Sequence, residues 1–205
     1  MKSLNGLALA VAALLITGCG GGGVGSTGAG AGASVAQLTG GEFASADASA
    51  AAAYCKQTKG EVFVRYPLYG TNGSSPLRLA GERSFCQYTS KKDGSRIHIL
   101  LSTLYTTKPS LAALAYILAP PTGSCQGNPA SCYCTLLGGS DQFGGTAGNG
   151  GGWYNKNSED QTLEACIFPD MSSIDSWGLA YHANGIVRGI DLTKVMRYKY
   201  PGSKG

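Results

Sequence analysis

The segment Asn128-Pro-Ala-Ser-Cys-Tyr-Cys-Thr-Leu-Leu-Gly-Gly139 is the stretch around which the fold is organised. It predicts a short helix with a signal at each end. Asn128 suits the N-cap, because its side-chain oxygen can accept a backbone N–H of the first turn. Pro129 suits the first helical position, where its missing N–H costs nothing. Gly138-Gly139 can take the left-handed conformation that ends a helix.

A second segment, Cys166-Ile-Phe-Pro-Asp170 and its continuation to Tyr181, is the predicted partner of the first. Its apolar and aromatic residues are bounded by the turn formers Pro169-Asp170, which predicts extended structure. The residues concerned are Phe168, Trp177, Leu179 and Tyr181. A helix that ends in a cysteine and a strand that begins with one favour a disulfide between Cys134 and Cys166.

The joint spacing of these motifs resembles that of a bacterial envelope family, domain of unknown function 333, whose members are often labelled haemolysins. The resemblance rests on Asn128 to Ser131, Tyr133-Cys134, Gly138-Gly139, Cys166 to Asp170, and Trp177. It covers about residues 128–185, with a degenerate first copy at about 47–105. The sequence departs from the family pattern at Met171-Ser172 and at the extra Cys132. The family resemblance implies an envelope location and no mechanism.

The first 18 residues have the features of a targeting segment. Lys2 supplies a positive start, and Leu7 to Ile16 is an apolar run too short to span a bilayer. The run ends at Thr17-Gly18-Cys19, which predicts a bacterial lipoprotein cleavage site with lipid, such as palmitate, carried on Cys19. More than one acyl chain is needed for a stable anchor.

Residues 19–46 are predicted to be a disordered tether that follows the lipidated cysteine. Gly20 to Ala33 consists almost entirely of small residues, which cannot bury enough surface to fold. The chain after the tether is long enough for one ordinary domain or two small ones.

The first half of the body repeats the order of the second. A helix predicted from Asp47 to Gly60 contains Tyr54-Cys55, and Cys86-x-Tyr88 and Ile97 follow. This order parallels Tyr133-Cys134, Gly138, Cys166-x-Phe168 and Ile174. We therefore predict an α+β fold made of two related units, each a helix plus an antiparallel hairpin stapled by a disulfide. The units are 47–119, which includes a linking helix, and 120–193; residues 194–205 form a basic tail.

Six cysteines remain once Cys19 is assigned to lipid, an even number that predicts a disulfide framework in an exported chain. The repeat selects one pairing among the fifteen that six cysteines allow. It pairs Cys55 with Cys86 and Cys134 with Cys166. Cys125 and Cys132 then pair by elimination.

Four further segments are assigned from local signals. Thr107 to Leu118 predicts a helix with Leu111, Leu114 and Leu118 on its packed face. Arg96 to Leu104 and Gly185 to Leu192 predict strands. Ser140 to Gly152, rich in glycine, predicts a mobile hairpin loop.

The sequence supplies no catalytic constellation, metal site or cofactor site. His98 alternates with apolar residues on its predicted strand, which favours a surface position. His182 has no second histidine at ligand spacing. Asp170 and Asp175 could form a carboxylate pair, but Pro-Asp is ordinary turn chemistry. The net charge of +4 is too small and too scattered to indicate nucleic-acid binding.

Aromatic side chains are the better candidates for binding, since they can contact sugars or protein partners. Trp177 and Tyr181 are predicted to fill the small cores. Trp153 and Tyr154 lie beside the glycine-rich segment and are therefore predicted to be exposed and to bind.

The sequence thus predicts a non-enzymatic lipoprotein of the cell envelope, with a structural or binding role. The absence of Asp after Cys19 favours the outer membrane, with the body facing the periplasm or the cell surface. Its partners would be the membrane, through Cys19, and another envelope protein or a glycan. The alternatives are a membrane-active, haemolysin-like protein and a periplasmic enzyme inhibitor.

Overall fold

The computed structural model describes residues 45–69, 77–141, 152–155 and 158–202. All of these belong to the compact unit that comprises Val35–Gly205. The predicted targeting segment, Cys19 and the tether as far as residue 44 lie outside the described residues, as does most of the predicted loop at 140–152.

The body combines six helices with eight strands of one antiparallel sheet among the described residues. The helices are α1 (Ser45–Gln57), α2 (Leu101–Tyr105), α3 (Leu111–Leu118), α4 (Pro129–Leu136), α5 (Ser176–Ala183) and α6 (Leu192–Val195). The strands are β1 (Glu61–Tyr69), β2 (Leu77–Arg78), β3 (Arg83–Thr89), β4 (Arg96–Leu100), β5 (Trp153–Asn155), β6 (Ser158–Leu163), β7 (Ala165–Ile167) and β8 (Ser173–Asp175). The predicted α+β class is therefore confirmed.

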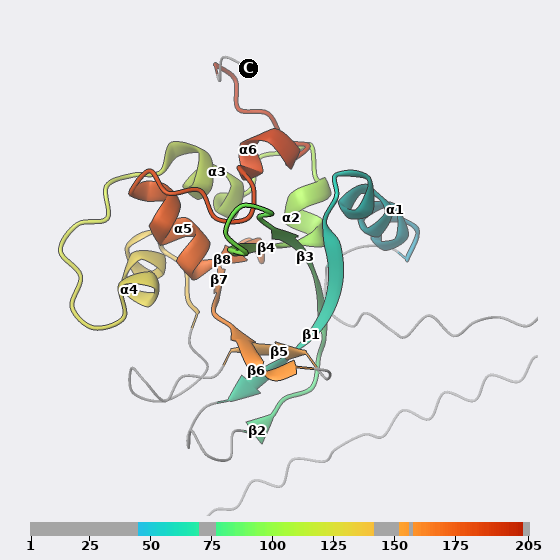
Figure 1. The fold of residues 1–205 in the computed structure, drawn as a ribbon, viewed down its shortest axis with the longest axis horizontal. Coiled ribbons are helices and arrows are strands. Elements are labelled where there is room, and N and C mark those ends of the chain that lie inside the picture. Colours follow the sequence, from blue (N-terminus) through green and yellow to red (C-terminus); the bar gives the residue numbers. More distant parts are fainter. Residues whose placement is uncertain (1–44, 70–76, 142–151, 156–157, 203–205) are drawn as a thin grey trace, which may run out of the picture. The chain divides into compact units, whose positions relative to one another are not determined.

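The sheet curls strongly (Figure 1). Its strand order is β6-β5-β1-β3-β4-β8-β7, and β2 adds to β1. The strands at the two ends of this order, β6 and β7, are separated in the chain by Glu164 alone. The two ends of the sheet are therefore held near each other, and one face of the sheet is turned inward.

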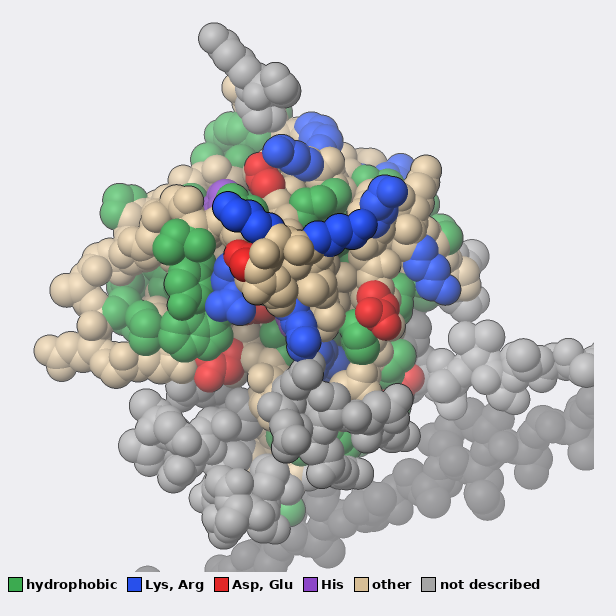
Figure 2. Space-filling view, in the orientation of Figure 1, with side chains coloured by type: hydrophobic (Ala, Val, Ile, Leu, Met, Phe, Trp, Pro, Cys, Tyr) green, Lys and Arg blue, Asp and Glu red, His purple; other side chains and the backbone are tan. Residues whose placement is uncertain are grey.

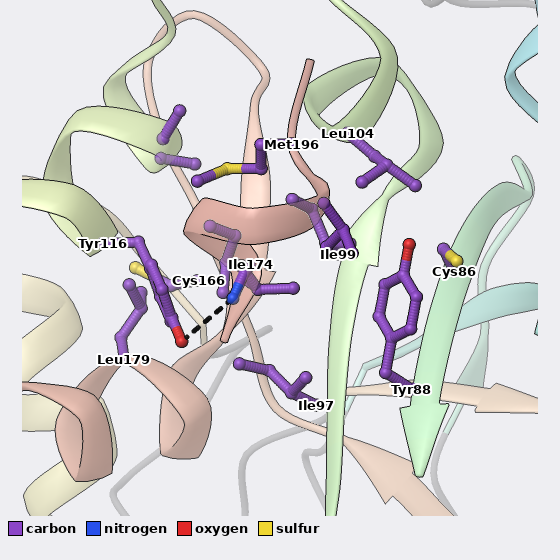
Figure 3. Packing of buried hydrophobic residues seen from close by; sticks show 14 of the residues in the cluster. Cys86, Tyr88, Ile97, Ile99, Leu104, Tyr116, Cys166, Ile174, Leu179 and Met196 are labelled. Carbon is purple, nitrogen blue, oxygen red and sulfur yellow. Dashed lines mark hydrogen bonds between the residues drawn. The ribbon is translucent and has the colours of Figure 1, made fainter. Parts of the chain in front are cut away.

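The outer face of the sheet carries the main core. Alternating residues of the strands point to opposite faces, and Ile97, Ile99 and Ile174 meet the helices on this side. Figure 3 shows them with Leu104, Tyr116, Leu179 and Met196, and with the hydroxyl of Tyr116, which accepts a 3.3 Å hydrogen bond from Leu192 N. The inward face holds a smaller apolar cluster of Phe85, Leu100, Trp153, Leu163 and Ala165.

The three disulfides are those that the sequence predicts. Cys55 bonds to Cys86, Cys125 to Cys132, and Cys134 to Cys166. The first and third join a helix to a strand and are fully buried, whereas Cys125 and Cys132 are partly exposed. The long-range bonds therefore lie inside the core, and the short-range bond closes a surface loop.

The predicted signals at the ends of α4 are confirmed. The Asn128 side chain accepts hydrogen bonds from Ala130 N at 2.9 Å and Ser131 N at 3.3 Å. Gly138 takes the left-handed conformation, with φ of +84°. After α1 the corresponding left-handed residue is Lys59, with φ of +69°, rather than Gly60.

Several predicted elements are wrong in kind. The segment expected to be extended through Tyr181 becomes helix α5 after Asp175, because the Asp175 carboxylate caps its first turn by accepting from Gly178 N at 3.0 Å. The predicted strand Arg96 to Leu104 ends at Leu100 and continues as α2. The predicted strand 185–192 is irregular up to α6.

The predicted linking helix, 107–118, forms only from Leu111 as α3, with Ser110 as its N-cap. Of its predicted packed face only Leu114 packs against the main core. Leu111 and Leu118 are exposed, at 43% and 56%, and the buried residues are Ala112, Ala113 and Tyr116. A residue distant in the sequence also caps the first turn of α3, since Asp170 Oδ2 accepts from Leu111 N at 2.7 Å. The Pro169-Asp170 turn therefore has a structural role in positioning α3.

Candidate functional site

A cavity of about 410 Å³ opens at the inward face of the sheet. Its lining residues come from β1, β4, the β6–β7 junction, β8, α5 and the segment after α5. They are Arg65, Arg96, His98, Thr162, Leu163, Glu164, Asp175, Trp177, Tyr181 and Arg188. This cavity, called the basic pocket below, contains three guanidinium groups and two carboxylates. Its volume falls in the range typical of small-molecule sites.

The buried end of the basic pocket is a hydrogen-bonded polar group. His98 Nδ1 lies 3.1 Å from Asp175 Oδ2. His98 Nε2 lies 2.8 Å from Gln87 Oε1 and 3.1 Å from an Arg65 guanidinium nitrogen. All four residues are at least nine-tenths buried. The predicted surface position of His98 is therefore wrong, because the curled sheet encloses the face on which the side chain lies.

Burial and like charge both act on the ionisation of this group. The pKa of Arg65 is lowered to about 10, mainly by burial; Asp175 opposes this lowering and the charge of Arg96 adds to it. Burial also lowers the pKa of His98, against the effect of Asp175, and the charges of Arg65 and Arg96 add to the lowering. The positive groups are thus crowded around a single carboxylate at this end.

The rim of the basic pocket is aromatic and charged. Trp177 and Tyr181, one helical turn apart on α5, are only partly buried, and their ring centroids are 5.8 Å apart with planes tilted by 34°. The Arg188 guanidinium lies 5.0 Å from the Tyr181 ring centroid, and Arg188 Nε donates to Arg96 O at 3.3 Å. The segment after α5 is therefore attached to the edge of β4.

Glu164 forms the side of the basic pocket at the β6–β7 junction. Its two carboxylate oxygens accept from Asn128 Nδ2 at 3.2 and 3.1 Å. Burial raises the pKa of Glu164, and hydrogen bonds from Asn128 and Trp177 oppose that rise. The N-cap of α4 therefore also fixes an acceptor of the pocket.

The structure corrects the predicted binding residues. Trp153 and Tyr154 are 4% and 2% exposed, because β5 pairs with β1 and directs both side chains into the body. Trp153 packs on Phe85 and Tyr154 packs on Tyr66. The sequence assigned Trp177 and Tyr181 to the core. Trp177 does pack against the main core, and both residues also line the basic pocket.

The polar groups at the buried end of the basic pocket are held by several hydrogen bonds. Asp175 is engaged by His98 and by the first turn of α5, and His98 Nε2 is engaged by Arg65 and Gln87. The described part of the chain contains no cluster of three or more His, Cys, Asp or Glu that could hold a metal ion.

A second, smaller cavity of about 280 Å³ lies beside α4. It is lined by Gln126, Asn128, Ser131, Cys132, Thr135, Ser140 and Asp141. Ser131 Oγ donates to Asp141 Oδ2 at 2.9 Å, and no basic or aromatic residue is among those lining the cavity. The basic pocket is therefore the stronger candidate site.

Within the described ranges, no helix is both long and apolar enough to span a membrane.

Comparison with known proteins finds no matching family model, no matching curated protein and no matching solved structure.

Proposed function

We propose that this chain is a non-enzymatic binding module of the cell envelope and that the basic pocket is its ligand site. The convergence of Arg65, Arg96 and Arg188 on one cavity with a partly exposed aromatic wall carries the proposal. Arg65 is buried, and Arg96 and Arg188 are half-buried. Guanidinium groups that line a cavity can bind an anionic group through paired hydrogen bonds.

The proposed location rests on the sequence alone. The apolar run that ends at Thr17-Gly18-Cys19 supports lipidation of Cys19, and the glycine-rich tether would separate the body from the membrane. Under this proposal the body is held at the outer membrane with the basic pocket free to face the periplasm or the cell surface. The resemblance to the envelope family labelled haemolysin supports the same location.

We also propose that the two halves of the body are copies of one unit. Cys86 is the Cα partner of Ile99, and Cys166 is the Cα partner of Ile174. In this register Ile174 corresponds to Ile99, two residues later than the Ile97 of the sequence alignment. In each half a glycine five residues after the helical cysteine packs on that half's own disulfide: Gly60 in the first and Gly139 in the second.

The binding function can be tested by fluorescence, because the chain has only two tryptophans. In the full chain with Trp153→Phe, Trp177 on the pocket wall becomes the single tryptophan. We expect saturable changes in its emission with members of a panel of anionic solutes. The panel also contains neutral and cationic solutes of the same size.

Two outcomes would contradict the proposed function. One is that no solute gives a saturable change in Trp177 emission. The other is that a bound solute is converted to product. Leakage of a dye from liposomes at neutral pH, caused by the wild-type chain, would support the haemolysin-like alternative instead.

A further inference from the structure

We infer that the Cys125–Cys132 disulfide is a modification site, which a dithiol reduces through the smaller cavity while the two core disulfides stay intact. The smaller cavity, lined by residues of α4 and its flanking segments, is called the α4 cavity below. This inference goes beyond the proposed binding function and does not depend on the basic pocket. It is argued from the exposure of the bond, from the α4 cavity and from the way in which α4 is held.

Exposure separates this disulfide from the other two. Cys125 and Cys132 are both partly exposed. The four cysteines of the other two bonds are completely buried, each with 0% exposure. Thiol–disulfide exchange begins when a thiolate attacks one sulfur of the bond, so access decides which bond reacts. The core bonds can react only after the body opens.

The α4 cavity gives a route to the bond. It has a volume of about 280 Å³, and its lining includes Cys132 itself and Gln126, the chain neighbour of Cys125. The carboxylate in this lining belongs to Asp141, which is 3% exposed and accepts from Ser131 Oγ at 2.9 Å. A small dithiol, or the cysteine side chain of a protein, can therefore approach the Cys132 end of the bond.

The segment that carries Cys125 is open and neutral. Residues 119–128 join α3 to α4 without helix or strand, and none of them is buried. The segment contains no charged residue. Figure 1 shows it at the left edge of the body, and Figure 2, in the same orientation, shows that edge without charged side chains. No acidic side chain of this segment would therefore repel an approaching thiolate.

Helix α4 is held in place by other contacts. Cys134 attaches it to β7 through the buried bond with Cys166. Asn128 caps its first turn, and Tyr133 Oη donates to Pro120 O at 2.6 Å. Reduction of Cys125–Cys132 would therefore release the segment between Pro120 and Asn128, while α4 stays attached to the body.

The proposed step is a complete exchange of electrons and protons. A thiolate of the dithiol attacks one sulfur, the S–S bond of the protein breaks, and a mixed disulfide forms. The second thiol of the dithiol then attacks the mixed disulfide and closes the disulfide of the dithiol itself. The protein gains two electrons and two protons as two cysteine thiols, and the dithiol loses the same number.

Dithiothreitol is the first probe, used on the full chain with Cys19→Ala, which leaves the six disulfide cysteines. Free thiols are alkylated at timed intervals and located by mass spectrometry. We expect Cys125 and Cys132 to be alkylated at least about a hundredfold faster than the core cysteines, since a core opening free energy of about 2.8 kcal/mol already gives that ratio. Tryptophan emission should keep its native value while these two cysteines react.

Two results would overturn the inference. One is reduction of a core disulfide at a rate similar to that of Cys125–Cys132. The other is a change in tryptophan emission in step with the alkylation of Cys125 and Cys132, which would show that this bond holds the fold. The double variant with Cys125→Ala and Cys132→Ala should keep the native emission and lose the fast-reacting thiols.

A matched pair of variants tests the route. Thr135 is exposed and lines the α4 cavity, so Thr135→Phe should slow the alkylation of Cys125 and Cys132 at least about threefold by narrowing the approach. Leu111→Phe adds a ring at an exposed position of α3 that does not line the cavity, and it should leave the rate unchanged. Equal rates in the two variants would overturn the cavity as the route.

A protein dithiol is the second probe and distinguishes the two sources of this chemistry. Reduced thioredoxin carries its thiols in a Cys-x-x-Cys motif. Reduction of Cys125–Cys132 by thioredoxin at a lower concentration than dithiothreitol requires would identify a protein as the source. Reduction by dithiothreitol alone would identify a small dithiol. Failure of both probes to reduce this bond before the core bonds would overturn the inference.

Discussion

Ile99 of β4 and Ile174 of β8 are Cα partners, and they join the two disulfide-bearing halves within the sheet. Cys86 lies opposite Ile99 on one side, and Cys166 lies opposite Ile174 on the other. Both isoleucines are completely buried. The two buried disulfides are thus placed at matching positions on either side of one contact.

The glycine that packs on each buried disulfide provides a paired prediction. A Cβ at Gly60 would lie 2.9 Å from Cys55 Sγ, and one at Gly139 would lie 3.0 Å from Cys134 Sγ. We expect Gly60→Ala and Gly139→Ala to lower the free energy of unfolding by similar amounts, about 2–3 kcal/mol, as for overpacking of a core. Urea denaturation without reductant measures both.

Gly94→Ala is the control for this pair, because Gly94 has a positive φ of +70° and open space around it. It should cost only about 1–2 kcal/mol, the left-handed penalty. If one of Gly60→Ala and Gly139→Ala were neutral while the other was costly, the equivalence of the two halves would be lost.

Local rules explain why much of the scaffold could be predicted from sequence. The cap at Asn128 and the left-handed Gly138 depend on neighbouring residues only, and the disulfide pairing follows from two similar cysteine spacings, 31 and 32 residues. Helix α5 was missed because Trp177, Leu179 and Tyr181 alternate as in a strand. The stronger signal was Asp175, which caps the helix.

The basic pocket could not be predicted, because it depends on how the sheet curls. Arg65 and His98 are 33 residues apart and come from strands that are not adjacent in the sheet. Alternation along β4 showed correctly that His98 faces away from Ile97 and Ile99, but only the curl encloses that face. The predicted exposure of Trp153 was wrong for a related reason. Its glycine neighbours indicate a loop, whereas pairing of β5 with β1 buries the residue.

The disulfides should differ in their contribution to stability. Replacing Cys134 and Cys166 together should cost more than replacing Cys125 and Cys132 together. The loops span 32 and 7 residues, and the chain-entropy difference is about 1.3 kcal/mol by logarithmic scaling. Cys134 and Cys166 are also fully buried, so the first pair of substitutions disturbs the core as well.

Denaturation of both double variants with Ala or Ser at the replaced positions measures this difference. Non-reducing peptide mapping of the wild type, after cleavage at Lys108, checks the pairing itself. A larger loss of stability in the Cys125 and Cys132 variant would contradict the prediction, as would a mapped bond between Cys55 and Cys166.

Stability should fall in mild acid because of His98. The pKa of His98 in the folded state is lowered by burial and by Arg65 and Arg96, with Asp175 opposing and Gln87 as the neutral neighbour. The unfolded chain therefore binds the proton first, and stability is lost as the pH falls below about 6.5, the ordinary value for histidine. The slope for one such group is at most about 1.4 kcal/mol per pH unit.

Urea unfolding between pH 8 and pH 5 measures that slope. The slopes of the wild type and the variants are compared, rather than their absolute stabilities. His98→Gln should flatten the profile. His182, whose pKa burial also lowers, supplies the parallel control His182→Gln, which should remove a separate part of the slope. An unchanged slope in His98→Gln would contradict the assignment.

Of the two carboxylates of the pocket, Asp175 should be the one whose neutralisation lowers the free energy of unfolding more. It accepts from His98 at 3.1 Å, and its charge opposes the lowering of the Arg65 pKa. Asp175→Asn keeps the size and the cap of α5 but leaves the buried Arg65 without that balancing charge. We expect a loss of about 3 kcal/mol, as when a buried charge pair is broken.

Asp191→Asn is the matched control, because Asp191 caps α6 in the same way, accepting from Thr193 N at 3.0 Å. Asn and Asp are nearly equivalent caps, so the stability of this variant should stay close to that of the wild type.

Added phosphate gives the decisive comparison. An anion in the basic pocket would restore part of the charge that Asp175→Asn removes, so phosphate should stabilise Asp175→Asn more than Asp191→Asn. Equal stabilisation of the two variants would indicate only the general effect of the salt, and would show that the excess positive charge of the pocket is not available to an anion.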